Sequence, residues 1–123
     1  MQRDPVPTPL SRMLVLALAS ALFTSAAHSM SLRELKALEK SHKQGDNYVH
    51  YYLVGVMEGA LEAHMQDVRN GAPARICLKG RPLEPHMAQS LFDAERLRNA
   101  ELYEADMPVQ LVLTHALTHT YPC

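Results

Sequence analysis

His115 and His119 are the residues of this 123-residue chain whose type and spacing first suggest chemistry. Residues four apart on a helix lie on the same side of it, so the two imidazoles could begin a metal site. Zinc takes four ligands, three of them from the protein in catalytic sites, and no His-Glu-x-x-His pattern supplies more here. We therefore predict a solvated polar face on the last helix, with no metal and no cofactor; a metal site and a partner-facing patch are the alternatives.

Acid–base and nucleophilic chemistry have little support in the sequence. Glu58 and Glu62 are also four apart, and paired carboxylates can act as acid and base, but on a helix they usually form a hydrated surface. The chain contains no Gly-x-Ser-x-Gly turn and no glycine-rich phosphate loop. We therefore predict a binding protein rather than an enzyme, without a catalytic residue.

The only two cysteines, Cys77 and Cys123, predict a disulfide bond. Cys123 is the last residue of the chain, where a free thiol would be reactive and without purpose. A bond between the two would tie the C-terminus back to the middle of the fold; two free thiols are the alternative. Disulfides persist in oxidising compartments, so the bond requires export from the cytosol.

Residues 1–29 are typical of a secretory signal. Basic residues precede an uncharged apolar run at 13–23, and small residues follow it. Cleavage after Ala27 or after Ser29 would suit signal peptidase. The apolar run is shorter than the about 20 residues that span a bilayer, so we expect no membrane association after cleavage.

The remaining domain, residues 30–123, is short and nearly neutral. Removing Arg3, Arg12 and Asp4 with the signal leaves 94 residues, with 10 basic and 12 acidic side chains and a net charge of −2. Because there is no basic stripe, nucleic acid is not an expected partner. A domain of this length buries only about 60–65% of its extended-chain surface, so a cross-link would add substantially to its stability.

Hydrophobic periodicity predicts an all-α fold, a compact four- to five-helix bundle stapled by one disulfide, in a single domain over residues 30–123. Ser31 begins the first helix with a capping box. Gly45 is expected to end that helix in a left-handed cap. The second helix is expected at about 47–69.

The third helix is predicted to begin near Pro85. The last is predicted to follow an Asp106 cap, with Pro108 in its first turn. Between them, residues 99–105 are either a weakly helical link or a short helix, and no segment alternates with the period of two that a strand requires. The apolar positions expected to face the core are Val49, Tyr52, Leu53, Val56, Ala60, Met65, Met87, Leu91, Ala94, Leu97, Val109, Val112, Leu113, Ala116 and Leu117.

Gly55, Gly59 and Ala63 form a stripe of small residues along the second helix, spaced by four. An interior helical glycine costs about 1 kcal/mol relative to alanine, so two of them require a reason. At this spacing they allow another backbone to approach closely. We expect close packing inside the chain, with a helix–helix contact across a homodimer as the alternative.

Several of these residues, taken together, resemble a known family. Their order is similar to the glycine-bearing helix, mid-chain cysteine and terminal aromatic-Pro-Cys of the Rap/Tai immunity proteins of type VI secretion systems. The likeness covers about 48–123. The chain departs from the family at Leu78, where a proline is usual, and in the link before the last helix, which lacks one. The residues that carry the likeness are Tyr52, Leu53, Val54, Gly55, Val56, Gly59, Ile76, Cys77, Leu111, Val112, Ala116, Leu117, Tyr121, Pro122 and Cys123.

The resemblance implies a periplasmic protein that neutralises a peptidoglycan amidase injected by neighbouring or sister cells. Members of the family act as homodimers and occlude the active-site cleft of the amidase with a helix and a protruding loop. The candidate partner-binding segments in this chain are the loops from Asn70 to Pro82, pinned by Cys77, and from Asn99 to Met107. A loop anchored by a disulfide is pre-organised, which lowers the entropy cost of binding.

An acid-stress chaperone of the HdeA type is the alternative function, since such proteins are also short, helical, exported and held by one disulfide. Six histidines remain after cleavage at Ser29, so protonation near pH 6 could shift the net charge from about −2 toward +4. Dissociation of a dimer at low pH would then follow. A metal-binding protein that uses His115 and His119, and an envelope enzyme, are further alternatives.

Overall fold

The structure, a computed structural model, describes residues 29–123. The predicted signal at 1–29 lies outside the described residues except for Ser29. The predicted cleavage position after Ala27 lies outside them too. No strand occurs within 29–123, so the all-α prediction is confirmed. The elements, in chain order, are α2 (Leu32–Ser41), α3 (Gly45–Arg69), α4 (Met87–Arg98), the short 3₁₀-helix η1 (Ala100–Leu102) and α5 (Val109–Thr120).

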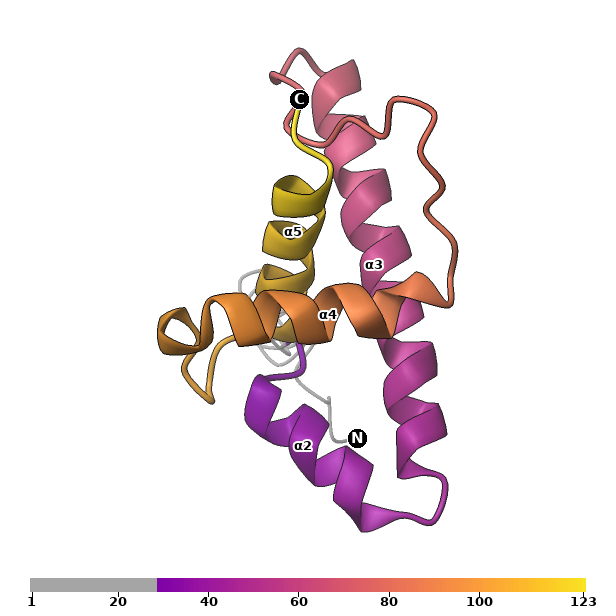
Figure 1. The fold of residues 1–123 in the computed structure, drawn as a ribbon, viewed down its shortest axis with the longest axis vertical. Helices are drawn as coiled ribbons and strands as arrows, with labels where there is room; N and C mark the ends of the chain where they lie inside the picture. Colours follow the sequence, from indigo (N-terminus) through magenta and orange to yellow (C-terminus); the bar gives the residue numbers. More distant parts are fainter. Residues whose placement is uncertain (1–28) are drawn as a thin grey trace, which may run out of the picture.

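The helices pack around α5 and the middle of α3. These two helices lie side by side, α4 crosses both of them, and α2 folds back against the start of α3 (Figure 1). The C-terminus lies beside the far end of α3, next to the loop that leaves it (Figure 1). The largest fully buried apolar side chains are Phe92, Leu53, Met57, Leu113, Leu117, Val109 and Val112.

The predicted capping box at the start of α2 is confirmed. The hydroxyl of Ser31 accepts from the backbone N–H of Glu34, whose carboxylate accepts from the N–H of Ser31. A helix start leaves four N–H groups without partners inside the helix. Two more of these groups donate to the carbonyls of Ala105 and Met107, at 2.8 and 3.0 Å. The segment before α5 therefore completes the cap of α2.

The predicted Asp106 cap of the last helix is wrong. α5 begins at Val109 with Pro108 in the cap position, and the N–H of Val109 donates to the carbonyl of Met30 at 2.9 Å. The Asp106 carboxylate accepts from Nε of Arg33 at 3.0 Å instead. The backbone of a distant segment replaces a local side-chain cap, and residue spacing alone does not reveal this.

The predicted role of Gly45 is also wrong. α2 ends at Ser41, and Gly45 is the buried first residue of α3 rather than a left-handed cap. A Cβ at this position would overlap the carbonyl oxygen of Glu39 and lie 2.8 Å from that of Leu38. Glycine is required here because the backbones of α2 and α3 meet at this turn.

Most of the predicted core positions are confirmed, including all five on α5. Three are exposed instead. Positions five residues apart on a helix differ by about 140° around its axis, so Met65 lies away from the buried side that carries Ala60. Positions six residues apart differ by about 120°, so Leu97 lies away from the buried side of α4 that carries Leu91. The exposed positions are Met65, Ala94 and Leu97.

The predicted disulfide joins Cys77 and Cys123, with 4.9 Å between their Cα atoms. Beside it, the N–H of Cys77 donates to the carbonyl of Tyr121 at 2.8 Å, and Ile76 pairs with Pro122 in an isolated antiparallel bridge. Such a bond is consistent with an oxidising compartment. Among the described residues, none of the helices has the length and hydropathy to span a bilayer.

Cys77→Ser and Cys123→Ser should lower the free energy of unfolding by the same amount, because either substitution removes the same cross-link. In the loop-entropy model a bridge across a separation of 46 residues contributes about 4 kcal/mol. Denaturant unfolding of both variants and of the double variant measures the loss. Two unequal losses that add in the double variant would show that the sulfur atoms act independently.

Gly45→Ala and Gly59→Ala should change stability in opposite directions. A Cβ at Gly45 meets the carbonyls of α2, so overpacking should cost about 1–3 kcal/mol. A Cβ at Gly59 meets nothing within 4 Å, so alanine should stabilise α3 by up to about 1 kcal/mol. Thermal unfolding compares the two, and a Gly45→Ala protein as stable as the parent would show that the turn adjusts freely.

Candidate functional site

Glu95 is the one buried charged side chain among residues 29–123, and only 1% of it is exposed. Its Oε1 accepts from the hydroxyl of Tyr103 at 2.6 Å and from the amide of Asn99 at 2.9 Å. Its Oε2 lies 2.9 Å from Nδ1 of His119. A buried carboxylate is tolerated when hydrogen bonds replace its lost hydration, and these three bonds do so.

Tyr103 extends these contacts to a second histidine. Its hydroxyl oxygen lies 2.9 Å from Nδ1 of His115, which is half-buried. Three segments meet here: α4, the link that follows it, and α5. The side chains that they contribute, which we call the Glu95 cluster, are Glu95, Asn99, Tyr103, His115 and His119.

The surroundings of the cluster shift two pKa values in opposite directions. Burial raises the pKa of Glu95, but hydrogen bonds from Tyr103, His119 and Asn99, with the charge of His119, outweigh it, so the pKa lies below its ordinary 4.5. Burial and the adjoining carboxylate raise the pKa of Tyr103. Glu95 is therefore ionised and Tyr103 protonated at neutral pH.

These protonation states determine where the imidazole protons lie. Tyr103 has one hydroxyl proton, which it donates to Glu95, so toward His115 its oxygen can only accept. Nδ1 of His115 must then carry a proton. Nδ1 of His119 must carry one too, since it faces a carboxylate, which only accepts. Both rings are held by Nδ1–H donors.

The predicted solvated polar face of the last helix is confirmed only in part: His119 is exposed and His115 half-buried, but Nδ1 of each ring is bound within this cluster. Sequence reasoning also missed Glu95 as a buried residue, although a signal was present. Glu95 lies four residues after Leu91 and three after Phe92, on the buried side of α4. A carboxylate at an apolar-face position indicates a buried polar contact.

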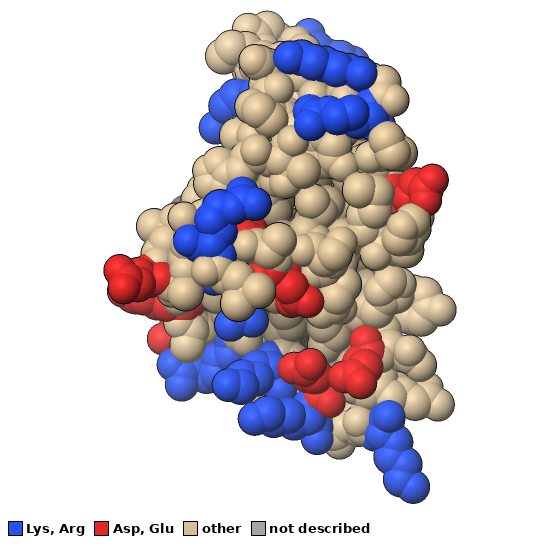
Figure 2. Space-filling view, in the orientation of Figure 1, with Lys and Arg blue, Asp and Glu red and all other residues tan. Residues whose placement is uncertain are grey.

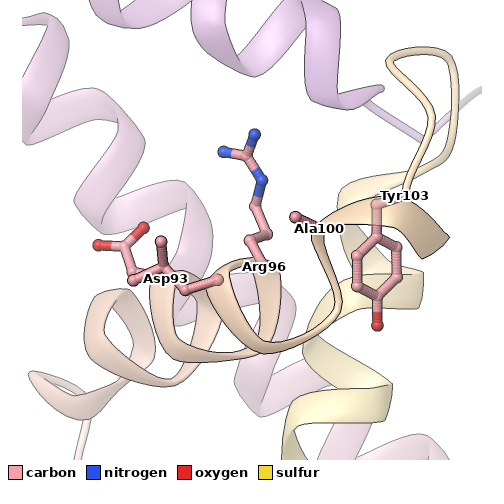
Figure 3. Close-up of a pocket in the computed structure, with 5 residues that line it drawn as sticks. Asp93, Arg96, Ala100 and Tyr103 are labelled. Atoms are coloured by element: carbon pink, nitrogen blue, oxygen red, sulfur yellow. The ribbon is translucent and has the colours of Figure 1, made fainter.

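The cluster joins α4, the link that follows it and α5, and its carboxylate is buried. A cavity of about 480 Å³ lies next to it, lined by Asp93, Arg96, Leu97, Ala100 and Tyr103. Figure 3 shows Arg96 extending toward α2, whereas the Tyr103 hydroxyl points toward α5. Glu95 does not line this cavity, and the hydroxyl proton of Tyr103 is donated to Glu95.

The 70–82 loop, one of the two predicted binding segments, is held in place by side chains as well as by the disulfide. The guanidinium of Arg81 donates to the carbonyls of Cys77 and Thr120, at 3.2 and 2.9 Å, and lies 4.6 Å from the ring centre of Tyr121. The hydroxyl of Tyr121 donates to the carbonyl of Pro82 at 3.0 Å. The second half of the loop is therefore pre-organised.

The structure does not bring the two predicted binding segments together. The 70–82 loop contacts the C-terminal end of α5 through Tyr121, and the 99–107 segment precedes its N-terminal end. Tyr103 of the 99–107 segment contacts His115 on α5, and Ala105 and Met107 bond to the start of α2, whereas the 70–82 loop bonds to Thr120 and Tyr121. Each can contribute to a separate surface.

The stripe of Gly55, Gly59 and Ala63 is exposed, so the expected close packing inside the chain is wrong. A Cβ at Gly55 or Gly59 would meet no atom within 4 Å. Tyr48 and Tyr51, at the start of the same helix, are also exposed. Figure 2 shows basic side chains at the end that carries the 70–82 loop and over α2, with mostly uncharged surface over the middle of α3.

Glu95→Gln should flatten the acid dependence of stability. Because the pKa of Glu95 is lowered in the folded protein, its contribution is present above about pH 4.5 and is lost as the pH falls through the lowered value. Urea unfolding between about pH 5 and pH 3 measures this loss, which the variant should lack. Glu58→Gln, which removes an exposed carboxyl on α3, is the control, and its stability should vary with pH as that of the parent does. Parallel profiles for the parent and Glu95→Gln would contradict the prediction.

Comparison with known proteins yields no relative for this chain. No protein-family model matches it, and no match is found among curated proteins or solved structures. The likeness to the Rap/Tai immunity proteins rests on the residues given above, and the function that it implies is a proposal.

Proposed function

We propose that this protein is an exported binding protein that inhibits a peptidoglycan amidase effector of a type VI secretion system. It would act in the periplasm, as a homodimer, and protect the cell from the effector. The observation that carries the proposal is the 70–82 loop, which is clamped by the disulfide and by the contacts of Arg81 and Tyr121. Three of the residues that form the clamp, Cys77, Tyr121 and Cys123, are also among those that resemble the immunity family.

The loop and the end of α3 together form a surface suited to a protein partner. Met65 is 46% exposed there, and Val68 is exposed next to it. A shallow cavity of about 280 Å³ lies between this end of the helix and the loop, lined also by Ala74 and Ile76. Nε2 of His64 accepts from the N–H of Ile76 at 3.3 Å and holds the loop against the helix. We call Met65, Val68 and Ala74 the loop surface.

The loop surface has the properties that lower the cost of binding. Its backbone is tied at Ile76 and Cys77, so little conformational entropy remains to be lost on association. Exposed apolar side chains such as Met65 release water when a partner covers them, and Arg69 supplies a charged rim. An inhibitor that must fill a cleft needs such a rigid protrusion.

We propose that self-association uses a different face, the middle of α3. The open backbone at Gly55 and Gly59 would let a second helix approach closely, and exposed Tyr51 lies beside it. Tyrosine is enriched in protein interfaces because it combines a large apolar ring with a hydroxyl group. A homodimer through the middle of α3 would leave the loop surface free for the effector.

Binding to purified amidase effectors, with inhibition of peptidoglycan cleavage as the readout, tests the proposal. Met65→Glu should weaken binding at least tenfold, because it places a charge in the apolar contact. Leu97→Glu is the matched control: it puts the same charge on a side chain of α4 that is 83% exposed and lies outside the loop surface. We expect it to bind like the parent. Failure to bind any cell-wall amidase would refute the function; a loss in Leu97→Glu alone would move the contact to the 99–107 segment.

The Glu95 cluster supports an acid-stress chaperone of the HdeA type as a second candidate. Protonation of Glu95 would remove the charge that its three donors stabilise and loosen the contact between α4 and α5. A chaperone of this type would suppress aggregation of client proteins at about pH 3 while its dimer dissociates. Aggregation that is unchanged by the protein at that pH would exclude this candidate.

A further inference from the structure

His115 and His119 direct their Nδ1 atoms toward Tyr103 and Glu95, and neither Nε2 has a hydrogen-bond partner within residues 29–123. The Nδ1–H of His119 donates to Glu95 and that of His115 to Tyr103, each at 2.9 Å. A neutral imidazole with its proton on Nδ1 carries a lone pair on Nε2. The side chain of His119 is 45% exposed, so solvent reaches this ring.

The separation of the two rings fits a shared metal ion. Their centres lie 6.0 Å apart and their planes differ by 34°. With nitrogen–metal distances of about 2.0–2.1 Å, two imidazoles on one ion have their centres about 4.5 Å apart at a ligand angle of about 90° and about 6.4 Å apart when they are opposite. The observed separation of the ring centres lies inside this range and is compatible with both rings binding one ion through Nε2.

Two imidazoles favour copper or nickel over zinc. No group of three or more His, Cys, Asp or Glu that could hold a metal occurs in the described part of the chain, whereas zinc sites take three or four protein ligands. Divalent copper and nickel accept nitrogen ligands in tetragonal geometry, with water at the remaining positions, and copper is bound most tightly in the first-row series. Calcium and magnesium prefer oxygen ligands and do not suit the pair.

We propose that His115 and His119 form a two-imidazole site for a divalent copper or nickel ion on α5. Glu95 and Tyr103 are positioning residues, since they accept from the Nδ1–H groups and so keep each lone pair on Nε2. Carboxylates behind metal-binding histidines act in this way and raise the basicity of the ligand. The site lies apart from the loop surface and does not depend on amidase inhibition.

Titration of the purified protein with Cu²⁺, followed by electron paramagnetic resonance and calorimetry, tests the site. We expect a copper signal with nitrogen hyperfine coupling that is lost in His115→Ala and in His119→Ala, together with at least a tenfold loss of affinity. His86→Ala, an exposed histidine before α4, is the matched control and should bind like the parent. Unchanged affinity in both α5 variants, or an equal loss in His86→Ala, would overturn the proposal.

A second variant separates the positioning role from folding. Tyr103→Phe keeps both imidazoles but removes the oxygen that accepts from His115. We expect several-fold weaker Cu²⁺ binding with an unchanged circular dichroism spectrum, and Cu²⁺ should raise the melting temperature of the parent more than that of the variant. Equal affinity in Tyr103→Phe and the parent would refute the positioning role of the cluster.

Discussion

Both ends of α5 are tied to segments that are distant in the sequence, and the rest of the structure depends on these ties. At its start, the N–H of Val109 donates to the carbonyl of Met30, just before α2. The first N–H groups of α2 donate in turn to carbonyls of the segment before α5. At its end, the disulfide, Arg81 and Tyr121 fasten the C-terminus to the loop after α3. Since α5 also packs against α3 and α4, these ties hold four helices together in a domain too small to rely on apolar burial alone.

The Glu95 cluster adds a third tie, of a different physical kind. Removing a carboxylate from water costs several kcal/mol, and the cost is recovered only when good hydrogen bonds surround the charge. Tyr103, Asn99 and His119 supply them, and within residues 29–123 no buried side-chain polar atom lacks a partner. An apolar contact would tolerate several packings of α4 on α5, whereas directional bonds specify one. Because the pKa of Glu95 is lowered, we expect this contact to weaken in acid.

The surfaces of the domain are separated in a way that allows several roles at once. The loop surface sits at the C-terminal end of α5 on a rigid backbone, whereas the open glycine stripe lies midway along α3. The imidazole pair lies on α5, where Tyr103 and Glu95 orient the two rings. The proposed binding of an effector, association of two copies and capture of a metal ion would therefore draw on different residues. None of the three needs a catalytic group.

The sequence by itself determined the helical class, the disulfide, the Ser31 cap and all five buried positions of α5, because neighbouring residues and a cysteine count carry this information. It also predicted a loop over residues 70–82 and placed His115 and His119 on one side of the last helix. Only the tertiary structure decided which groups surround Glu95, that Gly45 meets a backbone, and that Asp106 pairs with Arg33. Each of these depends on contacts between segments that hydrophobic periodicity treats separately; Arg33 and Asp106 are 73 residues apart. Local pattern specifies an element, but the groups that surround a side chain come from the whole fold.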